Sequence, residues 1–261
     1  MSTCIIVSAG EFTPENLHKG PEDIIIAADN GLSYLDAMGI QPDYLIGDYD
    51  SLDPAEKPEL DTFRRMFPGR ERTLPKAKDD TDTMAAVRWG FELGYTDFRL
   101  YGALGGLRVD HSISNLQTLM FILRRGGHGV ILSARQEVFL LRDASCDCEA
   151  GREGMFSLFA VDPAIRVTIR GMMFECENLE ITYDYPIGCS NEFLPEQAAH
   201  IEVRGGTALI VAYRGRWRAH GIRPPHQRGE APVDRHGDDR LYRTQPMHRR
   251  GEDRTLVMTQ V

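Results

Sequence analysis

Hydrophobic residues in the first half of the chain gather in short continuous runs. Five of these runs resemble strands: Cys4–Val7, Ile24–Ala28, Tyr44–Ile46, Phe98–Tyr101 and Val130–Leu132. Continuous apolar runs are typical of strands that are buried on both faces of a parallel sheet. Apolar residues recur at helical spacing over 84–91 and 113–123, between such runs. This alternation predicts a Rossmann-like parallel α/β domain over residues 1–135.

From Gln136 the pattern changes to short runs separated by turn signals. Apolar Ile165, Val167 and Ile169 alternate with polar residues, as in a strand that is buried on one face. Further runs of this kind are Val138–Leu141, Met155–Val161, Leu179–Thr182, His200–Val203 and Ala208–Tyr213. The pattern predicts an all-β domain over residues 136–215, a small β-sandwich.

The last segment, residues 216–261, has a different composition. It is rich in Arg, His, Gly and Pro and poor in aliphatic residues, and residues 214–261 hold 11 arginines against 6 acids. Such a segment buries little apolar surface, so we expect a disordered basic tail. A solvated extension without activity is favoured over a tail that binds nucleic acid or lipid, and deleting it should leave the kinetics intact.

Composition narrows the class of protein. The net charge of −9 and the acidic body are unlike those of a nucleic-acid binder, and no apolar stretch is long enough to span a bilayer. The five cysteines form no CxxC pair, which favours reduced thiols over disulfides or zinc. No basic segment with a long apolar core precedes the first strand-like run, so we expect no signal peptide and a cytoplasmic protein.

Acidic residues gather where strands end. Asp48 and Asp50 follow the run at Tyr44–Ile46, and Asp79, Asp80 and Asp82 lie at the start of a predicted helix. A helix cap explains one of Asp79 and Asp80, but not the whole set. Two carboxylates about 4 Å apart repel by roughly 1 kcal/mol in water and about 4 kcal/mol at a protein surface. A divalent cation offsets this repulsion, and oxygen ligands favour Mg²⁺, so we predict a magnesium–nucleotide site.

Glycine-bearing turns could supply the phosphate contacts, since the chain has no P-loop motif. Three turns follow predicted strands: Ser8–Gly10, Asp29–Gly31 and Gly102–Gly106. Their backbone N–H groups, at one edge of the sheet, could cradle phosphates. Arg108 could neutralise a transferring phosphate. Asp110 either caps the following helix or reaches the metal, and His111 is a general base or, as the favoured alternative, a structural residue.

Five stretches in this order resemble the thiamine pyrophosphokinase family: ADNG (28–31), PDYLIGDYDSL (42–52), KDDTDTMAA (78–86), GALGGLRVDHSISNLQ (102–117) and CSNEF (189–193). The resemblance covers roughly residues 3–213. It implies a homodimer with the active site at the subunit interface. It also implies Mg²⁺-dependent transfer of pyrophosphate from ATP to the hydroxyl of thiamine, giving thiamine diphosphate and AMP.

The resemblance also implies roles for individual residues. The catalytic set is Asp48, Asp50, Asp82, Arg108 and Asp110, of which Asp48, Asp50 and Asp82 hold the metal. The nucleotide-binding set is Asp29, Asn30, Gly31, Ser51, Lys78, Asp79, Thr81, Gly105, Gly106 and His111. The thiamine-binding set is Gln117, Ser190 and Asn191. One departure from the family pattern is Leu107, which separates the glycines from Arg108.

Three other functions fit part of this pattern. A pyrophosphokinase acting on a hydroxymethyl-pterin would share the metal acids and differ in the β domain. A catalytically silent thiamine- or nucleotide-binding protein would bind the ligand without forming AMP. A glycosyltransferase with a DxD motif would use Asp48 and Asp50 but leaves the later motifs unexplained.

Overall fold

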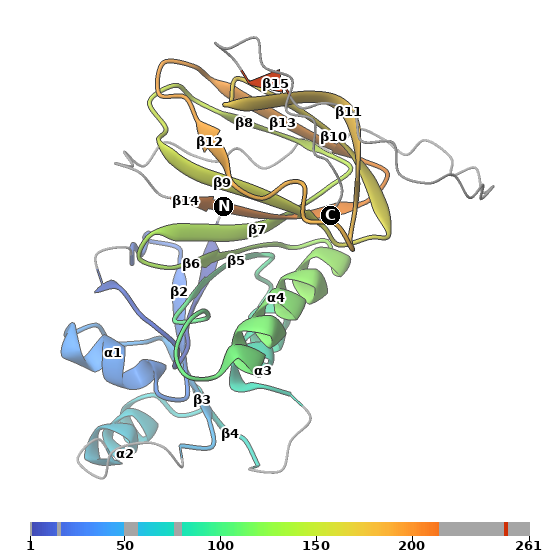
Figure 1. The fold of residues 1–261 in the computed structure, drawn as a ribbon. Helices are drawn as coiled ribbons and strands as arrows, with labels where there is room; N and C mark the ends of the chain where they lie inside the picture. The colour runs from blue at the N-terminus through green and yellow to red at the C-terminus, as the bar shows by residue number, and fades with distance from the viewer. Residues whose placement is uncertain (1, 15–16, 50–56, 76–79, 214–247, 250–261) are drawn as a thin grey trace. The chain divides into compact units, whose positions relative to one another are not determined.

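The computed structural model describes residues 2–14, 17–49, 57–75, 80–213 and 248–249. The chain divides into two compact units, residues 1–140 and 141–261 (Figure 1). Across the described ranges, no helix has both the length and the apolar character needed to cross a membrane.

The first unit is built on a largely parallel sheet. Its described strands are β1 (Thr3–Val7), β2 (Ile24–Ala28), β3 (Tyr44–Gly47), β4 (Glu71–Thr73), β5 (Asp97–Tyr101), β6 (His128–Leu132) and β7 (Gln136–Arg142). They lie in the order β7-β6-β5-β1-β2-β3-β4, and the pair β6–β7 is antiparallel. The five strands predicted for this half are confirmed, and Ile5, Ile6 and Leu100 are fully buried, as expected of central parallel strands.

Helices connect the parallel strands. They are α1 (Gly31–Ala37), α2 (Lys57–Met66), α3 (Asp82–Glu92) and α4 (Val109–Arg124). Figure 1 shows α1 and α2 on one face of the sheet and α3 and α4 on the other, and α3 packs against α4. The helical patterns over 84–91 and 113–123 are thereby confirmed. This division between faces follows from right-handed crossovers, because the chain runs from β2 to β4 in one direction across the sheet and from β4 through β5 to β6 in the other.

The cap of α3 corrects one expectation. The hydroxyl of Thr81 accepts a hydrogen bond from the backbone N of Met84 at 3.2 Å, so Thr81 caps the helix. Asp80 instead forms an ion pair with Arg88 at 2.5 Å, and Asp79 lies outside the described residues. A threonine hydroxyl at the position before the first helical residue satisfies an N–H group that the helix leaves unpaired.

The second unit consists of antiparallel strands. The strands are β8 (Ser145–Cys148), β9 (Gly154–Ala160), β10 (Ala164–Arg170), β11 (Phe174–Thr182), β12 (Asn191–Phe193), β13 (Ala199–Arg204), β14 (Thr207–Tyr213) and β15 (His248–Arg249). One group has the order β12-β9-β14 and a second sheet the order β15-β11-β10-β13-β8. The predicted alternation is confirmed, since Ile165, Val167 and Ile169 are buried. β15 falls within the expected tail, whose other residues lie outside the described ranges.

Candidate active site

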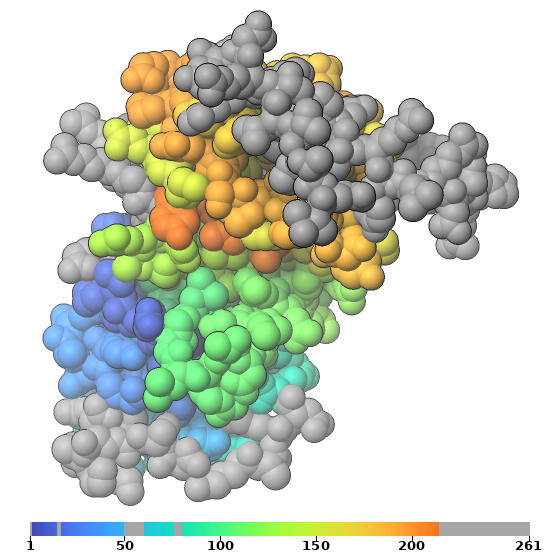
Figure 2. Space-filling view, in the orientation of Figure 1, coloured from blue at the N-terminus to red at the C-terminus, as the bar shows by residue number. Residues whose placement is uncertain are grey.

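A cavity of about 220 Å³ lies in the first unit at the carboxyl ends of β1, β2 and β5. Between β1 and β5 the order of the sheet reverses direction, and in open α/β sheets this is where ligands bind. The lining residues are Ser8–Gly10, Ala28, Asp29, Thr81–Thr83, Gly102, Ala103, Gly105–Arg108, His111, Ser112 and Asn115. Residues 102–108 and α4, green in Figure 2, lie at the surface of this unit.

Backbone contacts hold the β1 and β5 ends of the cavity together. The N–H of Ser8 donates to the carbonyl of Tyr101 at 2.8 Å, and the N–H of Gly10 donates to that of Gly102 at 2.7 Å. Gly102 has a φ of +60°, and a Cβ there would lie 2.2 Å from the carbonyl oxygen of Ser8. Only glycine fits this conformation and this close approach. The glycine turn after β5 is therefore fixed against the turn after β1.

Two of the predicted acids line this cavity. Asp29 follows β2 with a φ of +51°, and Asp82 is in the first turn of α3. Asp48 follows β3 and is half-buried. The N–H of Asp29 donates to the carbonyl of Ile46 at 2.9 Å, which ties the two acidic turns together. A non-glycine residue held in the left-handed backbone region costs on the order of 1–3 kcal/mol, and such residues cluster at active sites.

Four predicted residues, Asp50, Ser51, Lys78 and Asp79, lie outside the described residues. Within the described ranges, no group of three His, Cys, Asp or Glu side chains could hold a metal. Between Asp48 and Asp50 lies Tyr49, whose pKa is raised by burial and by the nearby carboxylate of Glu71. Asp29, which follows β2, and Asp82, in the first turn of α3, add to this effect on the pKa of Tyr49, so carboxylates from three different elements act on one side chain.

Arg108 reaches the cavity from the glycine loop. Its Nε and Nη2 donate to the carboxylate of Asp110 at 2.9 and 2.5 Å. The hydrogen bond from Arg108 lowers the pKa of Asp110 to about 2, and the carboxylate in turn raises the pKa of Arg108. Arg108 is also the N-cap residue of α4, and its side chain makes no capping hydrogen bond. Asp110 is bound to Arg108, and a backbone hydrogen bond from His111, in the first turn of α4, also lowers the pKa of Asp110.

Other predicted residues have structural partners. Asn30 precedes α1, and its Oδ1 accepts a hydrogen bond from the hydroxyl of Ser33 at 2.8 Å. Gly31 packs so tightly that a Cβ there would lie 1.9 Å from the carbonyl oxygen of Val7. Gln117 is exposed on α4 and does not line the cavity, whereas Thr81, Gly105, Gly106 and His111 line it.

The sequence alone assigned no role to Asn115 or Thr83, two residues that shape this cavity. The amide of buried Asn115 donates to the carbonyl of Ala103 at 2.7 Å and so holds the glycine loop to α4. The hydroxyls of Ser8 and Thr83 are 2.9 Å apart. Asn115 lies in the quoted stretch 102–117, so its one signal was a polar residue on the apolar face of the predicted helix.

An acidic side chain contacts the glycine loop itself. The N–H of Gly106 donates to the carboxylate of Glu11 at 3.2 Å. Gly105 and Gly106 have φ values of +74° and +79°, and successive N–H groups in such turns form concavities that attract anions. In this structure, a carboxylate of the chain therefore accepts a hydrogen bond from the loop that was predicted to hold phosphate.

The second unit holds Ser190 and Asn191 at the start of β12. Ser190 is exposed, with a φ of +66°, and its N–H donates to the hydroxyl of Ser157 at 3.1 Å. Hydrogen bonds with the hydroxyls of Ser190 and Ser157 lower the pKa of exposed Cys189. Asn191 is 4% exposed, and its amide bonds both the N–H and the carbonyl of Phe174, at 2.9 and 2.8 Å. Ser190 is thus accessible, while the amide of Asn191 binds β11.

Two family models match the chain. The model described as thiamin pyrophosphokinase, catalytic domain, matches residues 18–130. The model described as thiamin pyrophosphokinase, vitamin B1 binding domain, matches residues 146–207. Together the two models of one family match more than half of the chain. Among curated proteins, no match was found.

Several solved structures have a similar fold. Thiamine pyrophosphokinase from Bacillus subtilis has a TM-score of 0.70 and 22% identity, covering 82% of this chain and 99% of that one. The protein from Geobacillus thermodenitrificans has a TM-score of 0.68 and 23% identity, with coverage of 82% and 98%. The one from Candida albicans has a TM-score of 0.66 and 14% identity, with coverage of 82% and 89%. These likenesses show the fold, a mixed α/β protein with a large sheet and a second antiparallel sheet.

Proposed function

Because the chain belongs to the thiamin pyrophosphokinase family and is a thiamine diphosphokinase, we propose that its first unit binds ATP with Mg²⁺ and its second unit binds thiamine. The reaction transfers pyrophosphate from ATP to the hydroxyl of thiamine and releases AMP. Residues 1–135 act as a Rossmann-like catalytic domain, 136–215 as a thiamine-binding β-sandwich and 216–261 as a dispensable tail. A cytoplasmic location stays a prediction.

One observation carries the assignment of the nucleotide site: two carboxylates and a glycine turn meet in one cavity at the reversal of strand order. Carboxylate oxygens are the donors that Mg²⁺ prefers, and Mg²⁺ commonly takes one or two of them and shares its other positions with phosphates. Asp82 of the cavity, with Asp48 and Asp50, holds the metal, and Asp29 adds negative charge beside them. When bound, Mg²⁺ shields the charge of the polyphosphate.

The phosphates lie against the glycine loop. The N–H of Gly106, which bonds Glu11 in this structure, donates to a phosphate oxygen once the nucleotide displaces that carboxylate. Arg108 also lines the cavity, and Asp110 fixes the orientation of its guanidinium. Arg108 thereby stabilises charge on the transferring group, and the site positions the hydroxyl of thiamine for an in-line transfer.

Thiamine binds beside the exposed Ser190. The buried amide of Asn191 holds the start of β12 to β11, and this supports Ser190 in its left-handed conformation. Gln117, which is exposed on α4, is the other thiamine-binding residue. A homodimer completes the site at the subunit interface.

Phosphorus NMR of the full chain with ATP, Mg²⁺ and thiamine tests the reaction. AMP and thiamine diphosphate should appear together, whereas ADP with thiamine monophosphate would contradict the transfer of pyrophosphate. Asp82→Asn should abolish turnover because Asp82 lines the cavity. The matched control is Asp80→Asn, two residues away and ion-paired with Arg88, which should keep the wild-type rate. Equal rates in the two variants would contradict the assigned metal site.

A further inference from the structure

The residue between two of the predicted metal acids has an unusual conformation. Tyr49 follows Asp48 and has a φ of +53°, a region that bulky side chains rarely adopt. Its ring is nonetheless buried, with 9% exposure, in the apolar core of the first unit, together with Leu60 and Phe63 of α2. The backbone thus takes a left-handed turn directly after Asp48, and at that turn one aromatic side chain enters the core.

Neighbouring backbone leaves this turn little freedom. A Cβ at Gly47 would lie 3.1 Å from the Cα of Asp29 and 3.5 Å from Cε1 of Tyr49, so Gly47 lets both come close. The carbonyl of Gly47 accepts a hydrogen bond from the N–H of Leu74 at 2.8 Å. The end of β3 is therefore held between the acidic turn after β2 and the end of β4.

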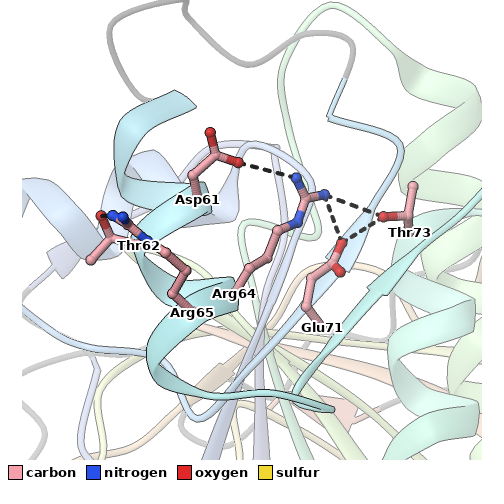
Figure 3. Close-up of polar contacts among 6 residues, drawn as sticks. All are labelled: Asp61, Thr62, Arg64, Arg65, Glu71 and Thr73. Atoms are coloured by element: carbon pink, nitrogen blue, oxygen red, sulfur yellow. Dashed lines mark hydrogen bonds and ion pairs between the residues drawn. The ribbon is translucent and has the colours of Figure 1, made fainter.

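A charged network covers the ring of Tyr49. The guanidinium carbon of Arg64, on α2, lies 5.8 Å from the centroid of the ring. Arg64 bonds Glu71 at 3.1 Å, Thr73 at 3.3 Å and Asp61 at 3.4 Å (Figure 3). α2 and β4 are thereby tied together over the turn. Arg65, the next residue, bonds Thr62 at 3.2 Å and, in Figure 3, points away from this network.

The hydroxyl of Tyr49 adds no hydrogen bond to this arrangement within the described residues. Its oxygen is buried and, among the described residues, has no hydrogen-bond partner. A buried hydroxyl without a partner costs free energy, so the side chain is held there by its ring. The roles of the hydroxyl and of the ring can therefore be tested separately. Removing the hydroxyl should leave the turn intact, whereas removing the ring should release it.

We infer that Tyr49 is a positioning residue for Asp48, one of the proposed metal acids: its buried ring, covered by Arg64, fixes the turn on which Asp48 stands. The inference rests on the proposed function, in which Asp48 is one of the residues that hold the metal. Partners that orient metal ligands typically change metal affinity or activity by about 10–100-fold when they are removed. Tyr49 touches neither substrate nor metal in this role, and it acts through the backbone of its neighbours.

The test measures Mn²⁺ binding by the EPR signal of the free ion, together with kcat and the Mg²⁺ concentration that gives half the maximal rate. Tyr49→Phe should match the wild type in all three. Tyr49→Ala should weaken Mn²⁺ binding by about 10–100-fold, raise the half-saturating Mg²⁺ concentration and lower kcat, with the KM for thiamine unchanged. Circular dichroism at the assay temperature checks that each variant is folded.

A second pair of variants keeps Tyr49 in place. Arg64→Gln should weaken Mn²⁺ binding in the same direction as Tyr49→Ala, and Arg65→Gln, its matched control, should not. If Tyr49→Ala does not fold, the Mn²⁺ affinities of Arg64→Gln and Arg65→Gln decide whether the inference holds. Folded Tyr49→Ala and Arg64→Gln with wild-type Mn²⁺ affinity would overturn the inference, as would a Tyr49→Phe variant as weak as Tyr49→Ala. A wild type that forms no AMP would overturn the proposed function instead, and the Mn²⁺ comparison would still decide the role of Tyr49.

Discussion

Substitution of Asn191 is the most direct way to tell whether its amide has a structural role or binds the substrate. Its Oδ1 accepts from the N–H groups of Phe174 and Glu192 at 2.9 and 2.8 Å, and its Nδ2 donates to the carbonyl of Phe174 at 2.8 Å. Asn191→Ala removes three hydrogen bonds at once. Each buried polar group left without a partner costs about 1–3 kcal/mol.

The substitution leaves backbone groups of Phe174 and Glu192 without their partner. Water reaches part of these groups, because Phe174 is half-buried and Glu192 is exposed. We therefore expect the free energy of unfolding to fall by an amount near the lower end of this range, about 2–3 kcal/mol in total. For a chain of this size, such a loss corresponds to a decrease in Tm of roughly 5–10 °C. Differential scanning calorimetry of the full chain measures it.

Ser190→Ala is the control, since Ser190 is the exposed neighbour and an exposed substitution changes stability by about 0.5 kcal/mol or less. We expect Ser190→Ala to keep the wild-type Tm and to weaken thiamine binding, measured by isothermal titration calorimetry. The reasoning would be refuted by an Asn191→Ala variant with an unchanged Tm and a selective loss of thiamine affinity. That result would mean that the amide binds the substrate rather than β11.

Three further changes test other parts of the first unit. Thr81→Ala should lower stability by about 1 kcal/mol through loss of the α3 cap and Thr81→Ser should restore it, as urea titration would measure; equal midpoints would contradict the cap. Gly31→Ala should cost about 3 kcal/mol or more, because its Cβ would lie 1.9 Å from the backbone oxygen of Val7; a normal Tm would contradict this packing. Arg108→Gln should raise the pKa of Asp110 from about 2 toward 3.8, seen by carboxyl-carbon NMR. Because Arg108 depresses this pKa in the folded state, any stability from the pair is present above pH 3.8 and is lost as the pH falls toward about 2.

Long apolar runs predicted the central strands, but short polar strands escaped detection. β2 reads IIIAA and was predicted at its observed bounds. β4 reads ERT, β8 reads SCDC and β12 reads NEF. These segments carry little hydrophobic signal, and they are strands because a neighbouring strand supplies hydrogen bonds, for example β3 for β4. Strand pairing of this kind is a tertiary property that local sequence does not encode.

The same distinction applies to the site. The meeting of Asp29 and Asp82 in one cavity could be predicted, because strand ends of a parallel sheet share one edge. The hydrogen bond from Gly106 to Glu11 joins residues 95 positions apart, and no local sequence pattern predicts it. The cap of α3 was assigned to the wrong side chain because aspartate and threonine both cap helices well, and only the geometry of the turn separates them.

Under the proposed function, the charge balance of the cavity favours a nucleotide that binds together with a cation. Within the part of the chain that the structure describes, the one arginine lining the cavity, Arg108, is already bound to Asp110, while Asp29 and Asp82 face the same space. A polyphosphate would add further negative charge beside these carboxylates, and at about 4 Å each such repulsion costs roughly 4 kcal/mol at a protein surface. Under the proposed function, Mg²⁺ that arrives with ATP offsets this repulsion. Nucleotide binding should therefore depend on Mg²⁺ more strongly than it would in a site lined by unpaired arginines.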